Sequence, residues 1–209
     1  MTLLRITAEG TNQARVTLWF SDGHKQVTST SVVAQLGLYQ GMTMDDQDME
    51  ALLAAVQKAA ARDRAVRIVS TTSISERQLK QRLLQRGEEP NAVDEAVDWL
   101  KELGAVDDGD MARRIVSQCQ SKGYGKNRIR QELYRKGIPR EYWDEALENL
   151  PDMSDAIDRF LAQRLRGREP DRKELQRAVA ALQRRGHGWE EIQSALRRYR
   201  DSLEESGWE

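Results

Sequence analysis

The sequence lacks the residues on which most disulfide-bonded, metal-binding and membrane-spanning proteins depend. Its single cysteine, Cys119, excludes an internal disulfide. Its only histidines, His24 and His187, lie far apart along the chain, which excludes a zinc site with the usual paired spacing of ligands. No apolar run approaches the roughly 18 residues that cross a membrane, and the first residues do not resemble a secretory signal. We therefore expect a reduced, cytoplasmic protein with no membrane partner and no metal or other cofactor.

The short motifs of several large enzyme families are also missing. The chain has no GxGxxG of dinucleotide-binding folds, no GxxxxGKS/T of nucleoside-triphosphatases and no GxSxG of hydrolases. We place His24 in a turn and His187 in a helix–helix connection, both as surface or capping residues. A Cys–His or Ser–His pair assembled by the fold stays open, although the spacings of the known families are absent. We expect that the protein is not an enzyme.

Positive and negative charges balance across the chain. Lys and Arg total 33 and Asp and Glu total 34, a net charge of −1, which excludes a uniformly polycationic nucleic-acid binder. Charged residues make up 32% of the chain, against about 25% in an average domain. Hydrophobic residues make up 39% and aromatic residues only 6%. This composition is typical of small helical units with much solvated surface.

The N-terminal part of the sequence predicts three short strands, near residues 3–8, 15–20 and 25–30. Asp22-Gly23 between the second and third is a strong hairpin signal. A three-stranded meander cannot bury both of its faces, so we expect it to pack on helices, one near 31–38 and another starting at Thr43. Alternation places one set of apolar residues on the inner face of the strands: Leu4, Ile6 and Ala8 in the first and Val16, Leu18 and Phe20 in the second.

A repeat fills the rest of the chain. Gly87, Gly137 and Gly186 stand 50 and 49 residues apart. Apolar residues recur eight and four positions before each glycine, and again 6, 9, 10 and 13 positions after it, which are the spacings of two helix faces. Each glycine falls at the end of the first of these helices, where a positive φ costs glycine little. Eight positions before the glycines stand Leu79, Ile129 and Ala178, and four positions before them stand Leu83, Leu133 and Leu182.

Each unit also has an upstream helix, starting near Asp108 in the second, near Ser154 in the third, and shorter, around 65–69, in the first. Cys119 and Phe160 lie on apolar stripes of these helices and are interpreted as core residues. The fold class is therefore mainly α: tandem three-helix repeats forming an elongated stack, with a small N-terminal β segment and helix. We expect a monomer with four parts, at residues 1–62, 63–106, 107–151 and 152–209.

Basic residues are concentrated on the second and third repeats. Nine lie between Arg113 and Arg140, where Glu132 is the only acid, and nine more lie between Arg159 and Arg185. Such an uneven distribution suits binding to a charged surface in one orientation. The candidate partner- or DNA-binding residues form a basic stripe: Arg113, Arg114, Lys122, Lys126, Arg128, Arg130, Arg135, Lys136, Arg177, Arg184 and Arg185.

Helical geometry gives four of these arginines equivalent places. At about 100° per residue, Arg128 and Arg135 nearly eclipse each other on the outer side of their helix, and Arg177 and Arg184 are their counterparts 49 residues later. The first repeat has glutamines at these positions, so we expect the contact surface to centre on repeats two and three. Lys136 and Arg185, directly before their glycines, are also explained by the helix dipole. The stripe as a whole is explained equally by an ordinary solvated face.

The motifs of the three repeats resemble those of the RecX regulatory proteins. The central one is Gly125-x-x-Arg128-Ile129-x-x-Glu132-Leu133-x-x-Lys136-Gly137-Ile138, preceded by Asp108-x-x-Met111-Ala112. Ser75-Glu76-x-x-Leu79-x-x-x-Leu83 and Arg184-Arg185-Gly186 resemble the matching motifs of the first and third repeats. Met111 and His187 stand where the family usually has an aromatic residue.

This resemblance implies a regulator that binds the RecA–DNA filament and inhibits recombination, ATP hydrolysis and co-protease activity. Such a protein acts in DNA repair, DNA recombination and the SOS response. The basic stripe would meet RecA, single- or double-stranded DNA, or both. The alternative is a direct DNA-binding regulator that uses its small three-helix repeats as helix-turn-helix units. Salt dependence of binding to naked DNA discriminates between the two, because phosphate-dominated binding weakens steeply with salt.

Overall fold

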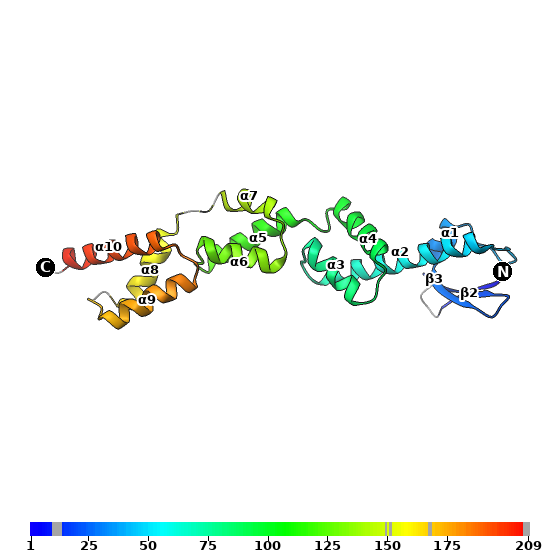
Figure 1. Ribbon diagram of the computed structural model, residues 1–209, viewed down its shortest axis with the longest axis horizontal. Helices are drawn as coiled ribbons and strands as arrows, with labels where there is room; N and C mark the ends of the chain where they lie inside the picture. The colour runs from blue at the N-terminus through cyan, green and yellow to red at the C-terminus, as the bar shows by residue number, and fades with distance from the viewer. Residues whose placement is uncertain (10–13, 149, 151, 167–168, 207–209) are drawn as a thin grey trace. The chain divides into compact units, whose positions relative to one another are not determined.

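A computed structural model describes residues 1–9, 14–148, 150, 152–166 and 169–206. The chain divides into two compact units, Met1–Val106 and Asp107–Glu209. The first contains the strands and the first helical repeat, and the second contains the other two repeats (Figure 1). The finer division into four parts, at residues 62, 106 and 151, stays a prediction.

The N-terminal sheet is antiparallel and has the order β1-β2-β3, formed by Leu3–Ala8, Arg15–Phe20 and Lys25–Ser29. Val16, Leu18 and Phe20 are buried, as the alternation predicts. The prediction for β1 was wrong at Leu4 and Ala8, which are exposed, and right for Ile6, which packs on the core. At Leu4 the reason is that the pairing register with β2 shifts between Leu3 and Arg5. This irregularity buries Leu3 completely and leaves Leu4 50% exposed. Such a shift re-aims side chains that strict alternation would place on the other face.

Two helices cover this sheet and lead into the first repeat. Helix α1 spans Thr30–Gln35, and α2 spans Asp46–Thr71. The start of α2 is fixed by Asp45, whose side chain accepts from the Asp48 amide while the Asp48 side chain accepts from that of Asp45. A separate short helix around 65–69 was expected, but α2 continues through this segment without a break. Its N-terminal half packs on the sheet, through Leu52 and Ala55, and its C-terminal half packs in the repeat, through Ala61 and Ala65.

In the first repeat, α2 is followed by α3 (Glu76–Gln85) and α4 (Pro90–Glu102). The Ser75 hydroxyl caps α3 by accepting from the Gln78 amide, and Pro90 occupies the first turn of α4. The core of the repeat includes Leu79 and Leu83 from α3 and Val93, Ala96, Val97 and Leu100 from α4.

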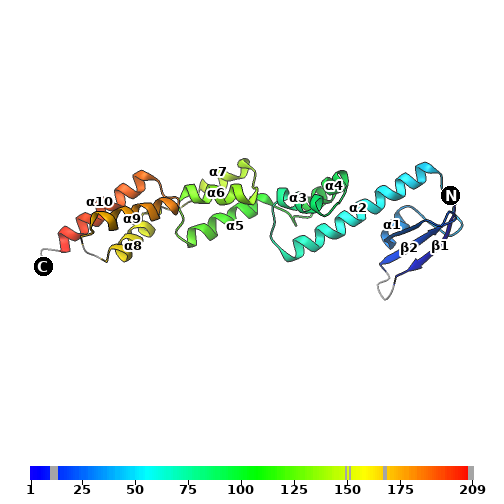
Figure 2. The ribbon, with the colours of Figure 1, turned by 60° about the horizontal axis from the view of Figure 1, so that its bottom comes forward.

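The second repeat contains α5 (Asp108–Ser121), α6 (Lys126–Lys136), a short 3-10 turn at Arg140–Tyr142, and α7 (Trp143–Glu148) (Figure 2). Cys119 is buried in its core, as expected. Burial raises the pKa of the Cys119 thiol and Glu132 adds to the shift, so the side chain behaves as a small apolar group.

The third repeat contains α8 (Ser154–Leu165), α9 (Arg172–Arg184) and α10 (Trp189–Ser206) (Figure 2). A full capping box at Asp171 and Glu174 begins α9. Ile157, Leu161 and Leu165 of α8 face its core, whereas Phe160 is only half-buried at the edge.

The glycines that define the repeat have the predicted backbone conformation. Gly87, Gly137 and Gly186 have φ values of 82°, 75° and 86°. The predicted core positions four and eight residues before them are all completely buried. These observations confirm the mainly helical fold with tandem three-helix repeats and a three-stranded N-terminal sheet.

No helix among the residues that the structure describes is both long and apolar enough to cross a membrane. Within the same residues, His, Cys, Asp and Glu side chains do not gather into a group of three that would hold a metal ion.

Candidate partner-binding cleft

The second and third repeats are joined by backbone hydrogen bonds between two turns. The Gly125 amide, at the start of α6, donates to the Arg185 carbonyl at 2.9 Å. The Asn127 amide donates to the Gly186 carbonyl at 3.1 Å. These bonds place the first turn of α6 directly against the last residues of α9, so side chains from both repeats meet at this junction.

The two glycines of the junction leave no room for a side chain. A Cβ atom on Gly186 would lie 2.2 Å from the backbone nitrogen of Arg128, and one on Gly125 would lie 2.4 Å from the Gly186 carbonyl oxygen. Glycine at 186 therefore provides both the positive φ and the close approach between the repeats. The same feature fixes the backbone of Arg128 beside Gly186.

His187 completes the junction, and its expected surface position was wrong. Its side chain is only 2% exposed. Its Nε2 lies 3.1 Å from the Gly123 carbonyl oxygen, which can only accept, so Nε2 carries the proton. Nδ1 is buried with no hydrogen-bond partner among the described atoms, 3.9 Å from the Glu191 carboxylate. Burial lowers the pKa of His187, against smaller opposing effects from Gly123 and Glu191.

A cleft of about 490 Å³ opens beside this junction. We call it the Arg–aromatic cleft. It takes one wall from the turn before α6 and from α6 itself, and the other from α8 and α9. Its lining residues are Tyr124, Arg128, Phe160, Arg164, Ala181, Arg184 and Arg185.

Two of its arginines lie over aromatic rings. The Arg128 guanidinium is 5.8 Å from the centre of the Tyr124 ring, and the Arg185 guanidinium is 4.8 Å from the centre of the Phe160 ring. Such contacts hold the charges in place. Arg128 also pairs with Glu132 at 2.9 Å, whereas no ion pair engages Arg185 among the described residues. Phe160 was expected to be a plain core residue; it packs on the core and also lines the cleft.

An adjoining hollow of about 330 Å³ extends the cleft along α8 and α9. The two share Arg164 and Arg184, so they form one continuous surface. The described residues that line this surface include no Asp, Glu, His or Cys, so it is suited to binding an anionic partner and not to acid–base or nucleophilic chemistry. Its cations are Arg128, Arg164, Lys173, Arg177, Arg184 and Arg185.

The structure thus gathers four members of the predicted basic stripe, Arg128, Arg177, Arg184 and Arg185, on one surface. Arg135 does not line it. The Arg135 guanidinium donates two hydrogen bonds to Glu132, whose other oxygen is 2.9 Å from Arg128. The hydrogen bond from Arg135, with help from Arg128, holds the pKa of Glu132 below its usual range.

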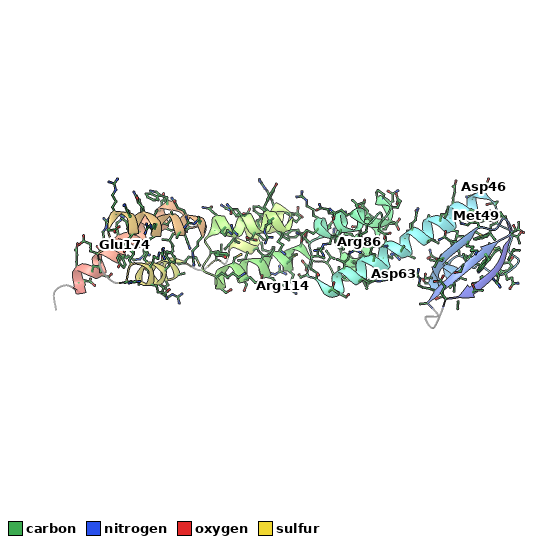
Figure 3. All side chains as sticks on the ribbon, turned by 90° about the horizontal axis from the view of Figure 1, so that it is seen from below. Asp46, Met49, Asp63, Arg86, Arg114 and Glu174 are labelled. Carbon is green, nitrogen blue, oxygen red and sulfur yellow. The ribbon has the colours of Figure 1, made fainter. Side chains whose placement is uncertain are left out.

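The other predicted residues lie outside the cleft. Arg113 and Arg114 are on α5, each within ion-pair distance of Asp110, and Figure 3 shows Arg114 on that helix. The remaining four members of the stripe line neither hollow: Lys122, Lys126, Arg130 and Lys136.

Sequence reasoning missed Arg164, Lys173, Tyr124 and Phe160 as parts of this surface. Arg164 and Lys173 lie in the basic segment between Arg159 and Arg185, but the repeat alignment gave them no special place. The four-residue spacing of Phe160 and Arg164 on α8 was the available signal, because it puts both on one side of the helix.

Two family models match the chain. One, described as the first three-helix domain of RecX, matches residues 61–100. The other, described as the second three-helix domain of RecX, matches residues 107–147.

Curated relatives and solved structures agree with these matches. Regulatory protein RecX of Halorhodospira halophila is 33% identical over 150 residues, which cover 68% of this chain and 89% of that protein. Regulatory protein RecX of Clostridioides difficile is 29% identical over 149 residues, 71% of this chain and 70% of that protein. A crystal structure of regulatory protein RecX superimposes with a TM-score of 0.73 at 22% identity, over 92% of this chain and 98% of that one. The structure from Lactobacillus salivarius gives 0.60 at 17% identity, over 68% and 96% of the two chains. These two structures support the fold alone.

Proposed function

The chain belongs to the RecX family of regulatory proteins, and from this premise we propose that it binds the RecA–DNA filament and inhibits RecA. Inhibition would lower strand exchange, ATP hydrolysis and co-protease activity, and so restrain recombination and the SOS response in the cytoplasm. The protein would act as a monomer and by binding alone. Its curated relatives carry the name of regulatory proteins, not of enzymes.

One observation supports assigning this contact to specific residues. The Arg–aromatic cleft and its adjoining hollow place six cations on one surface, with no lining acid among the described residues. A filament of RecA and DNA offers phosphates and acidic side chains, and a surface of one sign accelerates and orients association with such a partner. Arginine beside aromatic rings also suits contact with a nucleic-acid strand. We propose this surface, and not the whole basic stripe, as the contact with the filament.

The test reverses two charges that both hollows share. Arg164→Glu together with Arg184→Glu should abolish co-sedimentation with RecA–single-stranded DNA filaments and relieve inhibition of RecA ATP hydrolysis. Neither guanidinium has an ion-pair partner among the described residues, so the melting temperature should change little.

The matched control reverses two members of the predicted stripe outside the cleft. Lys126→Glu with Arg130→Glu changes the net charge equally, on exposed positions of α6. This control should retain filament binding. An equal loss of filament binding in both variants would show that the partner contacts the whole basic face. Unchanged inhibition by the Arg164→Glu/Arg184→Glu variant would show that the cleft is not part of the contact.

The helix-turn-helix alternative is decided by a measurement without RecA. A direct DNA-binding regulator should bind a particular duplex sequence far more tightly than others at physiological salt. We expect instead no sequence preference and a steep loss of affinity with salt.

A further inference from the structure

A second strongly basic cleft lies in the other compact unit, and none of its lining residues belongs to the proposed stripe. Its volume is about 490 Å³, and it opens between the end of the sheet at β3, the C-terminal half of α2 and the end of α3. Five arginines line it: Arg15, Arg64, Arg67, Arg82 and Arg86. They come from three separate elements, so only the fold brings them together.

Three of the five arginines have no ion-pair partner in the part of the chain that the structure describes. Arg64 is paired with Glu88, and Arg15 is 3.9 Å from Glu9. The other three arginines, at positions 67, 82 and 86, are exposed and have no ion-pair partner among the described residues. The helix dipole accounts for a basic residue at the end of α3, but it gives no reason for arginines on α2 and β2 to face the same space.

Asp63 is the one acid that lines the cleft in the described part of the chain. Figure 3 labels Asp63 on α2 and Arg86 directly after α3, and both helices contribute lining residues. Against the three guanidinium groups that have no ion-pair partner among the described residues, this single carboxylate still leaves the cleft attractive to anions.

A buried polar group at the same place also lacks a partner. Thr28, on β3, is 7% exposed and lines the cleft. Its hydroxyl oxygen has no hydrogen-bond partner among the described atoms. A buried hydroxyl without a partner is costly, and such groups in native proteins call for a reason such as a ligand.

We propose that this cleft, which we call the β3–α2 cleft, binds the phosphodiester backbone of a single-stranded nucleic acid. All five cations are arginines, whose planar donors match phosphate oxygens in pairs. A single phosphate cannot pair with all of these guanidinium groups at once, which favours a ligand that carries several phosphates in a row. Short aliphatic side chains, among them Val56 and Ala59, line the rest of the cleft and suit sugar rings. No lining aromatic residue of the described chain would stack a base, so binding should be independent of sequence.

This cleft could bind nucleic acid whether or not the protein inhibits RecA, so the test leaves RecA out. Fluorescein-labelled oligodeoxythymidylate is titrated with the full chain carrying Arg164→Glu and Arg184→Glu, which silences the Arg–aromatic cleft, and anisotropy is measured at several salt concentrations. Adding Arg67→Glu and Arg82→Glu should weaken binding by about tenfold or more at low salt. It should also reduce the slope of log affinity against log salt by about 1.4, or about 0.7 for each lost phosphate contact.

The matched control adds Arg77→Glu and Arg172→Glu to the same background. These exposed arginines begin α3 and α9, lie outside both clefts, and produce the same change in net charge. Affinity should stay within about twofold, as for ordinary surface changes. Equal losses in test and control variants would mean that net charge alone drives binding, and would overturn the site.

Arginine modification locates the ligand directly. Phenylglyoxal labelling of the unmodified full chain, read by mass spectrometry, should be suppressed at Arg67 and Arg82 by oligodeoxythymidylate and unaffected at Arg77. Three results would overturn the proposal. The first is that the oligonucleotide gives no protection. The second is that ATP or inorganic phosphate protects these arginines at a lower concentration of phosphate groups than the oligonucleotide does, which would assign the cleft to a small phosphate compound. The last is protection by polyglutamate but not by the oligonucleotide, which would assign it to an acidic protein segment.

Thr28→Val tests whether the buried hydroxyl takes part. The two side chains have nearly the same shape, so the variant should fold and keep its melting temperature or exceed it. In the background with the silenced Arg–aromatic cleft, oligonucleotide affinity should fall several-fold with an unchanged salt slope, because the lost contact is uncharged. An unchanged affinity would remove Thr28 from the site.

Discussion

At the scale of single residues, His187 shows how burial changes an ordinary side chain. It sits at the junction of two repeats, donates from Nε2 to the Gly123 carbonyl, and leaves Nδ1 without a hydrogen-bond partner among the described atoms. Protonating Nδ1 would bring a charge into this buried site, where only the Glu191 carboxylate, at 3.9 Å, would offset it. The neutral imidazole is therefore the form that fits the fold.

This arrangement predicts acid sensitivity of the junction. In the unfolded chain the imidazole titrates near its ordinary pKa of 6.5, and burial holds the folded pKa below that value. Between the two pKa values the unfolded state binds more protons, so the free energy of unfolding falls as pH drops through about 6.5 and keeps falling until the folded pKa is reached. Denaturant titrations from about pH 7.5 to 5 should show this loss in the wild type and a smaller one in His187→Gln.

His24→Gln is the control for that measurement, because the His24 side chain is exposed in the turn after β2. Its stability should follow the wild-type pH profile. Parallel profiles for the wild type and His187→Gln would contradict the role assigned to the buried imidazole.

At the scale of secondary-structure elements, the repeated glycine turns are alike in backbone conformation but not in surroundings. Gly87 and Gly186 have nearly the same positive φ, 82° and 86°. A Cβ atom on Gly87 would meet nothing within 4 Å, whereas one on Gly186 would collide with the backbone of Arg128. The first turn is therefore needed for its conformation alone, and the second for conformation and packing between repeats.

Alanine at each glycine separates the two requirements. Gly87→Ala should lower the free energy of unfolding by about 1–2 kcal/mol, the cost of a left-handed non-glycine residue. Gly186→Ala should cost about 1–3 kcal/mol more, because the repeats must move apart to admit the methyl group. Equilibrium denaturation of the two variants measures this difference in the free energy of unfolding. Equal losses would mean that the junction admits the methyl group at no cost.

At the scale of the whole molecule, the chain consists of two compact units that meet at adjacent residues. Val106 is 4% exposed and belongs to the core of the first repeat. The side chain of Asp107 accepts from the Asp110 amide at 2.8 Å and so starts the first helix of the second unit. Each unit has its own apolar cores, and a change in one core should be felt mainly within its unit.

Leu133→Ala tests this independence. The side chain is completely buried on α6, and its truncation should cost about 2–5 kcal/mol. Hydrogen exchange followed by mass spectrometry should show faster exchange throughout the second repeat and unchanged protection in residues 46–102. Tyr134→Ala, at the neighbouring position that is 67% exposed, should change little. Loss of protection in the first unit as well would mean that the two units unfold together.

The strands, the helices and the repeat are predictable from local patterns, because they depend on side-chain periods of two and 3.6 residues and on glycine at positive φ. The predicted core positions four and eight residues before Gly87, Gly137 and Gly186 are all buried. Where a local irregularity intervened, as at Leu3, periodicity misplaced the inner face by one residue. The prediction also placed a separate short helix around residues 65–69, whereas α2 continues through this segment without a break.

Which charged side chains share a surface depends on how the helices pack together. Arg128 and Arg184 lie 56 positions apart and come together because the turn that begins α6 donates two backbone hydrogen bonds to the turn after α9, and Arg164 joins them from a third helix. Periodicity assigns each residue to a face of its own helix, but it does not predict how one helix packs on another. The burial of His187 and the meeting of arginines from β2, α2 and α3 in the β3–α2 cleft have the same origin.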